Sequence, residues 1–326
     1  MKNPLWFSHI EGIEQINSLG RAKTPFLFIL SYDKQKIFAQ PLEDLESDIL
    51  YKLKSHRNYP PKKRACAYTL KQSPISFDAY KSSFEKVIEE IAKGNSYLLN
   101  LTFETPIETN LSLKEIFTYS QAKFKLYFQG EFICFSPEEF IHIEENTIST
   151  YPMKGTIEAS KPNAREQILA NPKEMAEHVM IVDLMRNDLG IIGDSIRVDK
   201  FRYIDKIRAG EKELLQVSSH IKATLQPNWN NTIGTLLDAL TPAGSITGTP
   251  KKRTRAIIDA VENHQRGFYT GVFGVYDGAS LHSGVMIRFI ESKEGKLLYK
   301  SGGGITIDSK VADEYQELRD KIYLPL

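Results

Sequence analysis

The stretch TYPMKGT, residues 150–156, places a single lysine between a proline and a glycine at the end of a β-rich segment. A lysine in such a place is ordinarily a solvated turn residue, so the heptapeptide alone indicates no chemistry. A lysine acts as a nucleophile at neutral pH only when burial or nearby positive charge lowers its pKa from about 10.4. Lys154 is therefore a candidate nucleophile only if other residues enclose it in a site.

Acidic residues occur at helical spacing in the stretch EMAEHVMIVDLMRNDLG. Its capping residues and apolar content predict a largely buried helix over residues 172–189 that ends at Gly190. Asp183 and Arg186 can pair with each other at i,i+3. Glu177 has no basic residue at i+3 or i+4. Because a buried carboxylate needs a partner, Glu177 requires a positive charge from elsewhere, and a metal cation is one candidate.

The C-terminal stretch SKVADEYQELRDKI predicts a helix from about Ser309 that carries Glu314, Glu317 and Lys321. Taken alone, Glu317 and Lys321 form an ordinary surface pair worth roughly 0.3–0.5 kcal/mol. Carboxylates from two distant helices would suit Mg²⁺, which takes oxygen ligands and often shares a substrate oxygen. The histidines and cysteines of the chain show no zinc-binding spacing.

Three further features favour anions. Gly302–Gly304 in SGGGITID let backbone N–H groups converge on an anion, although a simple β-bulge is equally compatible. GSITGTPKKR predicts a helix with Thr249 at its N-cap and Pro250 at its first position, and such a terminus attracts carboxylates. Arg288 is expected inside the apolar strand VMIRFI. A metal site, carboxylate receptors and a lysine together imply a small, multiply acidic substrate.

Composition narrows the class of partner. The 326 residues carry a formal net charge of +1, with basic and acidic residues mixed along the chain, so neither nucleic acid nor an anionic membrane is an expected partner. Cys66 and Cys134 show no redox or metal spacing, which favours a reducing compartment. The N-terminal residues lack the apolar stretch of a signal peptide, and the longest apolar runs are too short for a membrane helix. We expect a cytoplasmic protein.

The pattern of elements predicts an α+β fold. Residues 26–42 read as a hairpin, residues 76–94 as a helix stopped by Gly94, and residues 97–153 as antiparallel hairpins that lead directly to Lys154. Strands mostly follow strands, which favours an antiparallel architecture over a doubly wound parallel sheet. We expect residues 1–75 to form a short β-rich segment packed on a catalytic domain of residues 76–326.

Eight stretches spread over residues 76–322 resemble, in order and separation, a family of chorismate-utilising enzymes that includes component I of anthranilate synthase and of aminodeoxychorismate synthase. The resemblance implies one chorismate-binding domain, with stacked antiparallel sheets, helices packed outside and the active site between the sheets. The stretches that carry it are SPEEF, YPMKGT, AEHVMIVDLMRNDLG, GSITGTPKKR, RGFYTGVFG, VMIRF, SGGGI and ADEYQELRDK.

The residue before the GT dipeptide separates the reactions of this family. Anthranilate, isochorismate and salicylate synthases usually have alanine there, whereas Lys154 resembles the nucleophile of aminodeoxychorismate synthases. Leu98 stands where isochorismate and salicylate synthases carry a lysine base. The resemblance implies that Lys154 adds to C2 of chorismate while Glu138 protonates the leaving 4-hydroxyl. Ammonia from a separate glutamine amidotransferase subunit would then attack C4, in a step toward p-aminobenzoate and folate.

The same resemblance assigns the remaining site residues. It implies Mg²⁺ held by Glu177 and Glu317, with Glu314 as a further metal-site carboxylate and Lys321 close by. The residues that would hold the carboxylates of chorismate are Arg288, Tyr269, Gly302, Gly303, Gly304, Thr247, Gly248 and Lys321.

Three departures from the family pattern keep alternatives open. Gln216 stands where relatives commonly have histidine, the arginine often found after GT is missing, and the region before Ser76 is short. The short region puts a tryptophan site and the docking of an amidotransferase in doubt. The alternatives are an anthranilate synthase component I, which Lys154 argues against, and a non-catalytic chorismate-binding protein, which the departures alone support.

Overall fold

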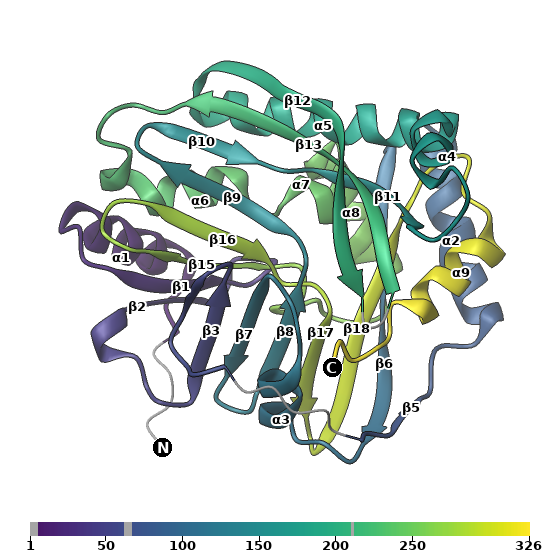
Figure 1. Cartoon of the computed structure of the whole chain (residues 1–326), viewed down its shortest axis with the longest axis horizontal. Coiled ribbons are helices and arrows are strands. Elements are labelled where there is room, and N and C mark those ends of the chain that lie inside the picture. The colour runs from purple at the N-terminus through teal and green to yellow at the C-terminus, as the bar shows by residue number, and fades with distance from the viewer. Residues whose placement is uncertain (1–5, 62–66, 210–211) are drawn as a thin grey trace.

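The computed structural model describes residues 6–61, 67–209 and 212–326, and these build two antiparallel sheets with helices around them (Figure 1). Cys66 and part of the basic stretch after residue 55 lie outside the described residues. Within the described part of the chain, no helix is long and apolar enough to cross a membrane. The helices are α1 (His9–Arg21), α2 (Phe77–Ala92), α3 (Leu113–Tyr119), α4 (Ala164–Ala170), α5 (Pro172–Ile192), α6 (Ile233–Leu240), α7 (Gly244–Thr247), α8 (Lys251–Val261) and α9 (Val311–Asp320).

Sheet 1 runs in the order β11-β13-β10-β9-β16-β15-β1-β2, with β12 paired to β13. The hairpin expected over residues 26–42 is confirmed, because β1 and β2 pair antiparallel through this turn. The strands of sheet 1 are β1 (Phe26–Leu30), β2 (Ile37–Pro41), β9 (Glu139–Glu144), β10 (Thr147–Thr150), β11 (Met153–Glu158), β12 (Asp194–Ala209), β13 (Lys212–Thr224), β15 (Val272–Tyr276) and β16 (Leu281–Val285).

Sheet 2 runs in the order β14-β6-β18-β17-β8-β7-β3-β4, with β5 paired to β6. The early strands β1 to β4 therefore extend both sheets. The strands of sheet 2 are β3 (Ile49–Leu53), β4 (His56–Arg57), β5 (Leu70–Gln72), β6 (Leu98–Thr109), β7 (Phe124–Phe128), β8 (Phe132–Ser136), β14 (Gly248–Thr249), β17 (Phe289–Lys293) and β18 (Lys296–Ile305).

The core explains why several strands are apolar on both faces. In β1, Phe26 and Phe28 pack into a cluster with residues of α5 and α6, while Leu27 and Ile29 pack into a cluster with strands of sheet 2. Since side chains alternate across a strand, FLFIL is continuously apolar because both of its faces are covered. The stacked sheets with helices outside confirm the predicted α+β class.

Helix α5 differs from the prediction in its end and its burial. It continues through Gly190 to Ile192, so Gly190 is not the helix cap. Val179 is 48% exposed, so the helix is not buried on every face. The predicted pairing of Asp183 with Arg186 is present at 3.1 Å, but at the surface, with the two side chains 77% and 50% exposed. Helix α5 therefore packs into the core beside sheet 1 with one face and leaves its other face exposed.

Two other local predictions were wrong by small shifts. Helix α8 begins at Lys251 with Pro250 at its N-cap, since Thr249 is still extended and pairs with Leu98 of β6. Pro250 itself is extended, with a ψ of 133°, so the first helical residue is Lys251. Arg288 lies between β16 and β17 with a positive φ of 53°, and not within a strand.

Candidate active site

The chain passes from one sheet to the other at two points that carry predicted site residues. Glu138 lies between β8 of sheet 2 and β9 of sheet 1, and Arg288 lies between β16 of sheet 1 and β17 of sheet 2. The two crossings are adjacent: Val285 N donates to the Glu138 carbonyl at 3.2 Å, and Phe135 N donates to the Arg288 carbonyl at 3.1 Å. The backbone therefore brings an acid and a guanidinium together where the sheets meet.

Lys154 points inward from β11 toward sheet 2. Its Nζ lies 3.0 Å from Glu177 Oε2 of α5, and the two side chains are only 25% and 15% exposed. A Cβ placed on Gly304 of β18 would lie 3.4 Å from Lys154 Nζ and 3.1 Å from Leu98 Cδ1. The missing side chain at Gly304 thus leaves room beside the amine, and the residue at position 98 next to it is apolar.

The charge state of Lys154 differs from the expectation. Burial lowers its pKa, but attraction by Glu177, together with Glu317 and Glu174, outweighs burial and raises the pKa above its usual value. The predicted lowering of this pKa was therefore wrong for the protein without a bound cation. The physical reason is that the carboxylates near the amine outweigh both its burial and the nearby charge of Lys321.

Helix α9 brings two carboxylates and a lysine close to Gly303. A Cβ placed on Gly303 would meet Glu314 Oε2 at 3.3 Å, Glu317 Oε1 at 3.6 Å and Lys321 Nζ at 3.9 Å. Lys321 Nζ lies 2.6 Å from Glu317 Oε1 and donates to the Gly302 carbonyl at 2.7 Å. Burial raises the pKa of Glu317, but Lys321, Lys154 and Arg288 outweigh it and lower that pKa overall. Glu317 of α9 and Lys154 thus shift each other's pKa.

The donor set fits a hard divalent cation. Glu177, Glu314 and Glu317 offer only carboxylate oxygens, the ligand type that Mg²⁺ prefers. Among the described residues, these three do not place one oxygen each within 4.8 Å of one another. Mg²⁺ needs only one or two protein carboxylates, because waters and substrate oxygens complete its shell. The residues therefore fit a magnesium ion shared with a substrate carboxylate.

Glu138 is suited to hold a proton. Its half-buried carboxyl accepts a hydrogen bond from Ser245 Oγ. Burial raises its pKa, and this effect exceeds the opposing influence of Ser245, Lys154, Arg288 and Lys321. A carboxyl with a raised pKa that faces cationic side chains can deliver a proton to a leaving group.

Arg288 and Tyr269 have features of an anion receptor. Arg288 Nε is buried and has no hydrogen-bond partner within the described ranges. The Tyr323 ring lies 5.6 Å from the Arg288 guanidinium carbon, and Tyr269 is buried against the Phe289 ring. A buried guanidinium N–H without a partner is costly, so a bound carboxylate would complete its hydrogen bonding.

The glycines of β18 lie at an opening of sheet 2. Gly302, Gly303 and Gly304 pair with β6 on one side, whereas the pairing of β17 with β18 begins at Phe289 and Lys300 and runs away from them. Successive N–H groups of a strand point to opposite sides, so the three amides do not converge on one anion as predicted. Only alternate N–H groups can face the open side.

Thr247 and Gly248 have structural partners of their own. The Thr247 hydroxyl donates to the Ala243 carbonyl at 2.8 Å. Gly248 has a φ of 119°, and a Cβ there would lie 1.8 Å from the Leu98 carbonyl oxygen, so only glycine fits. Gln216 of β13 pairs with Thr156 of β11, which places this departure on the strand beside Lys154.

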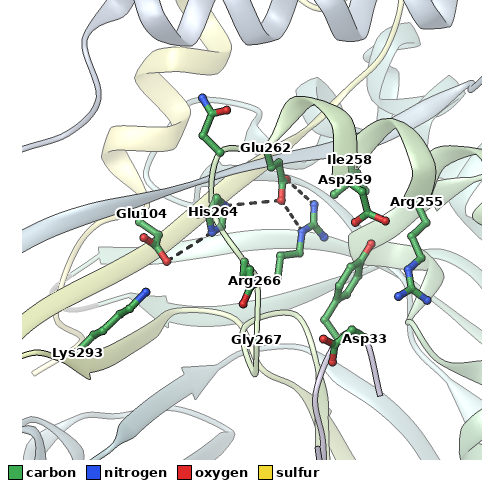
Figure 2. Close-up of a pocket in the computed structure, with 13 residues that line it drawn as sticks. Asp33, Glu104, Arg255, Ile258, Asp259, Glu262, His264, Arg266, Gly267 and Lys293 are labelled. Carbon is green, nitrogen blue, oxygen red and sulfur yellow. Dashed lines mark hydrogen bonds and ion pairs between the residues drawn. The ribbon is translucent and has the colours of Figure 1, made fainter. Parts of the chain in front are cut away.

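A second buried cluster lies beside a polar cavity of about 620 Å³. Figure 2 shows Glu262 between His264 and Arg266 at its wall. Arg266 Nη2 lies 2.7 Å from Glu262 Oε1, and Arg266 Nη1 donates to the Ile246 carbonyl at 3.0 Å. Sequence reasoning missed this pair, although Arg266 is the first residue of the quoted stretch RGFYTGVFG. None of the predicted site residues lines this cavity or the apolar groove along α5.

Comparison with known proteins places the chain in a family. Residues 21–326 match the family of chorismate binding enzymes. A Haemophilus influenzae protein described only as PabA-like is 48% identical over 315 residues, or 96% of each chain. Aminodeoxychorismate synthase component 1 of Bacillus subtilis is 32% identical over 269 residues, which span 77% of this chain and 55% of that protein.

A solved structure supports the fold. MenF, the menaquinone-specific isochorismate synthase from Escherichia coli, superposes with a TM-score of 0.71 at 15% identity, over 97% of this chain and 82% of that chain. At this identity the likeness concerns the fold alone. The family match over residues 21–326 shows that the chain belongs to the chorismate binding enzymes.

Proposed function

We propose that this chain is component I of an aminodeoxychorismate synthase, which converts chorismate and ammonia to 4-amino-4-deoxychorismate. The observation that carries the proposal is the inward-pointing Lys154, whose Nζ lies beside Glu177 and Gly304. Position 98, next to the same glycine, carries a leucine, so it offers no lysine base that could activate water. The 32% identity to an aminodeoxychorismate synthase component 1 supports the same reaction.

In the first step, the neutral amine of Lys154 attacks C2 of chorismate. The two ring double bonds shift toward C4, and the C4–O bond breaks with its electron pair on oxygen. Glu138, with its raised pKa, gives its proton to that oxygen, which leaves as water. The ring is then joined to Lys154 through a C2–N bond.

In the second step, ammonia attacks C4 and the double bonds shift back. The C2–N bond breaks, the electron pair returns to the Lys154 nitrogen, and the new ammonium at C4 gives a proton to the Glu138 carboxylate. Both residues are restored and the pyruvyl ether of chorismate is untouched. Arg288, with its unpartnered Nε, would hold a carboxylate of the substrate throughout.

Magnesium would be held by Glu177 and Glu317, with Glu314 nearby. When bound, it would neutralise the carboxylates that favour protonated Lys154 and would attract the ring carboxylate of chorismate. Lys154 could then hold a larger neutral fraction for attack.

Ammonia would come from a separate glutamine amidotransferase subunit, in a pathway to p-aminobenzoate and folate. The names component 1 and PabA-like, carried by relatives, support such a two-component arrangement.

The test is to incubate the protein with chorismate, Mg²⁺ and ammonium and to identify the product by mass spectrometry. Addition of a lyase that removes pyruvate should then yield p-aminobenzoate. Formation of anthranilate or isochorismate instead would reject the proposed reaction while leaving the family assignment intact.

A further inference from the structure

Two groups of three ligand-type side chains share no residue with the candidate active site. Glu139, His142 and His282 each place one ligand atom within 4.8 Å of the other two, and so do His56, Asp277 and His282. In the first group, β9 supplies Glu139 and His142 and the distant β16 supplies His282. In the second group, the ligands come from β4, from the turn after β15 and from β16. Because each set spans distant parts of the chain, the sequence shows no zinc-binding spacing.

A β-bulge brings Glu139 and His142 to one face of sheet 1. In a regular strand, residues three apart point to opposite faces. In the pairing of β9 with β16, His142 is opposite His282 and Glu139 is opposite Gly284, so three steps on β9 match two on β16. The extra residue reverses the alternation, and bulges are known to redirect side chains in this way.

The histidines of this group are arranged as a cross-strand pair. His142 and His282 are directly opposite, with ring centroids 4.5 Å apart. His282 Nδ1 is buried and has no hydrogen-bond partner in the described part of the chain. Burial is the main cause that lowers the pKa of His142 and that lowers the pKa of His282 to about 4. Neutral imidazoles have a lone pair available for a metal ion.

The group with Glu139 is the better of the two. Asp277 is exposed, and its carboxylate accepts hydrogen bonds from Ala279 N at 2.9 Å and from Ser280 N at 2.7 Å, so it is committed to a turn. Glu139 Oε1 lies 2.7 Å from the ammonium of Lys54, whose side chain is 39% exposed. A flexible, partly exposed lysine can move away when a cation of higher charge arrives.

We propose that Glu139, His142 and His282 bind a divalent transition-metal ion of the zinc class. Two imidazoles and one carboxylate form a set that zinc accepts, with a fourth position left for water or for His56, whose ring lies 4.9 Å from that of His282. Magnesium prefers all-oxygen sets, so the two ions would occupy different sites. The bound metal would link β9 to β16, the strands next to Glu138 and Arg288.

The first test is calorimetric titration of the full chain with Zn²⁺ in excess Mg²⁺, so that the oxygen site is already saturated. We expect one tight equivalent in the wild type and at least about tenfold weaker binding in His142→Ala and His282→Ala. The control is His9→Ala, because His9 pairs with Asp238 at the surface and should leave affinity unchanged. Equal affinity in His282→Ala, or no stoichiometric binding to the wild type, would overturn the proposal.

Two further measurements do not depend on how the alanine variants fold. Co²⁺ added to the wild type should give the visible bands of a four- or five-coordinate site with nitrogen ligands, and Zn²⁺ should remove them. Lys54→Met should bind Zn²⁺ several-fold more tightly, because the ammonium no longer competes for Glu139. A Co²⁺ spectrum of the hexaaqua ion, or weaker binding in Lys54→Met, would contradict the assigned ligands.

Discussion

Two ion pairs among the described residues have different surroundings. Arg266 and Glu262 are each 2% exposed, and the arginine also donates to the carbonyls of Ile246 and Asn100. Lys154 and Glu177 are partly accessible, and the lysine Nζ faces the space left by Gly304. In the first pair, the arginine N–H groups bond to acceptors of the protein, so the pair stabilises the fold. The second keeps a partly accessible amine beside a glycine, an arrangement that suits chemistry on a substrate.

Removal of the Lys154 amine should have the largest effect. Lys154→Met should lower the rate of amination by about 10⁴-fold, because the nucleophile is lost while the residues proposed to hold magnesium and the substrate stay. The measurement is product formation from chorismate and ammonium, with chorismate binding followed by calorimetry. The matched control is Lys161→Met, at an exposed position, which should retain full activity. Equal rates in both variants would remove Lys154 from the mechanism.

Loss of the Arg266–Glu262 ion pair should lower the stability of the fold. Arg266→Met should cost about 3–5 kcal/mol in the free energy of unfolding, because the buried Glu262 carboxylate would lose its guanidinium partner and keep only the hydrogen bonds from Thr102 and the nearby ring of His264. Urea unfolding measures this cost. Arg186→Met removes a surface pair and should cost no more than about 1 kcal/mol. Similar losses in the two variants would refute the distinction between the pairs.

A substitution at Glu138 tests whether this residue is the proton donor of the candidate active site. Glu138→Gln should lower amination by about 10²-fold, since the amide cannot protonate the leaving hydroxyl. Its pKa is raised, so in the wild type the protonated form persists to higher pH and activity should fall as pH rises through that value. The pH–rate profile should lose this fall in Glu138→Gln. An unchanged profile would assign the proton to another group.

Filling the space beside Lys154 should have a smaller effect. In Gly304→Ala, the new Cβ would lie 3.4 Å from Lys154 Nζ and 3.1 Å from Leu98 Cδ1, so the amine should lose freedom and activity should fall roughly tenfold. The control is Gly190→Ala, where the nearest atom would be 3.9 Å away. Steady-state kinetics of the two variants should show the fall in activity for Gly304→Ala and not for Gly190→Ala.

Another buried lysine, Lys125, shows what burial does to a pKa where no carboxylate of the described residues offsets it. Its Nζ donates to the Ser120 carbonyl at 2.7 Å, and burial, followed by repulsion from Lys52, lowers its pKa to about 7. Stability should therefore rise between pH 7 and 10 by about 1 kcal/mol per pH unit, because the unfolded chain binds the extra proton. Lys154, with a raised pKa, contributes stability that is lost only at higher pH. Urea unfolding of Lys125→Met should lose the rise, and an unchanged slope would contradict this account.

Local elements were predictable because their signals are local. Ser76 caps α2 and Gly94 follows its end with a φ of 76°, as the spacing and the glycine indicated. The proximity of Lys154, Glu177 and α9 followed from the family resemblance and not from spacing. Nothing in a single sequence places residues 154, 177 and 304 together, because β11, α5 and β18 meet only after both sheets have formed.

The missed features depend on long-range contacts or on register. Arg288 reads as a strand residue because its neighbours are apolar, yet the chain changes sheets there. The bulge that places Glu139 and His142 on the same face depends on pairing with β16, so the sequence of β9 alone does not predict it. Likewise, the raised pKa of Lys154 depends on how many carboxylates reach it, which spacing along the chain does not determine.

The most direct test of the account is to look for the covalent bond to Lys154. The wild-type protein would be mixed with chorismate and Mg²⁺ without ammonia, quenched, digested and analysed by mass spectrometry. We predict that the peptide containing Lys154 gains the mass of chorismic acid less one water, and that Glu138→Gln does not form this adduct. An unmodified Lys154 peptide, from protein that still forms the 4-amino product once ammonium is added, would contradict the account.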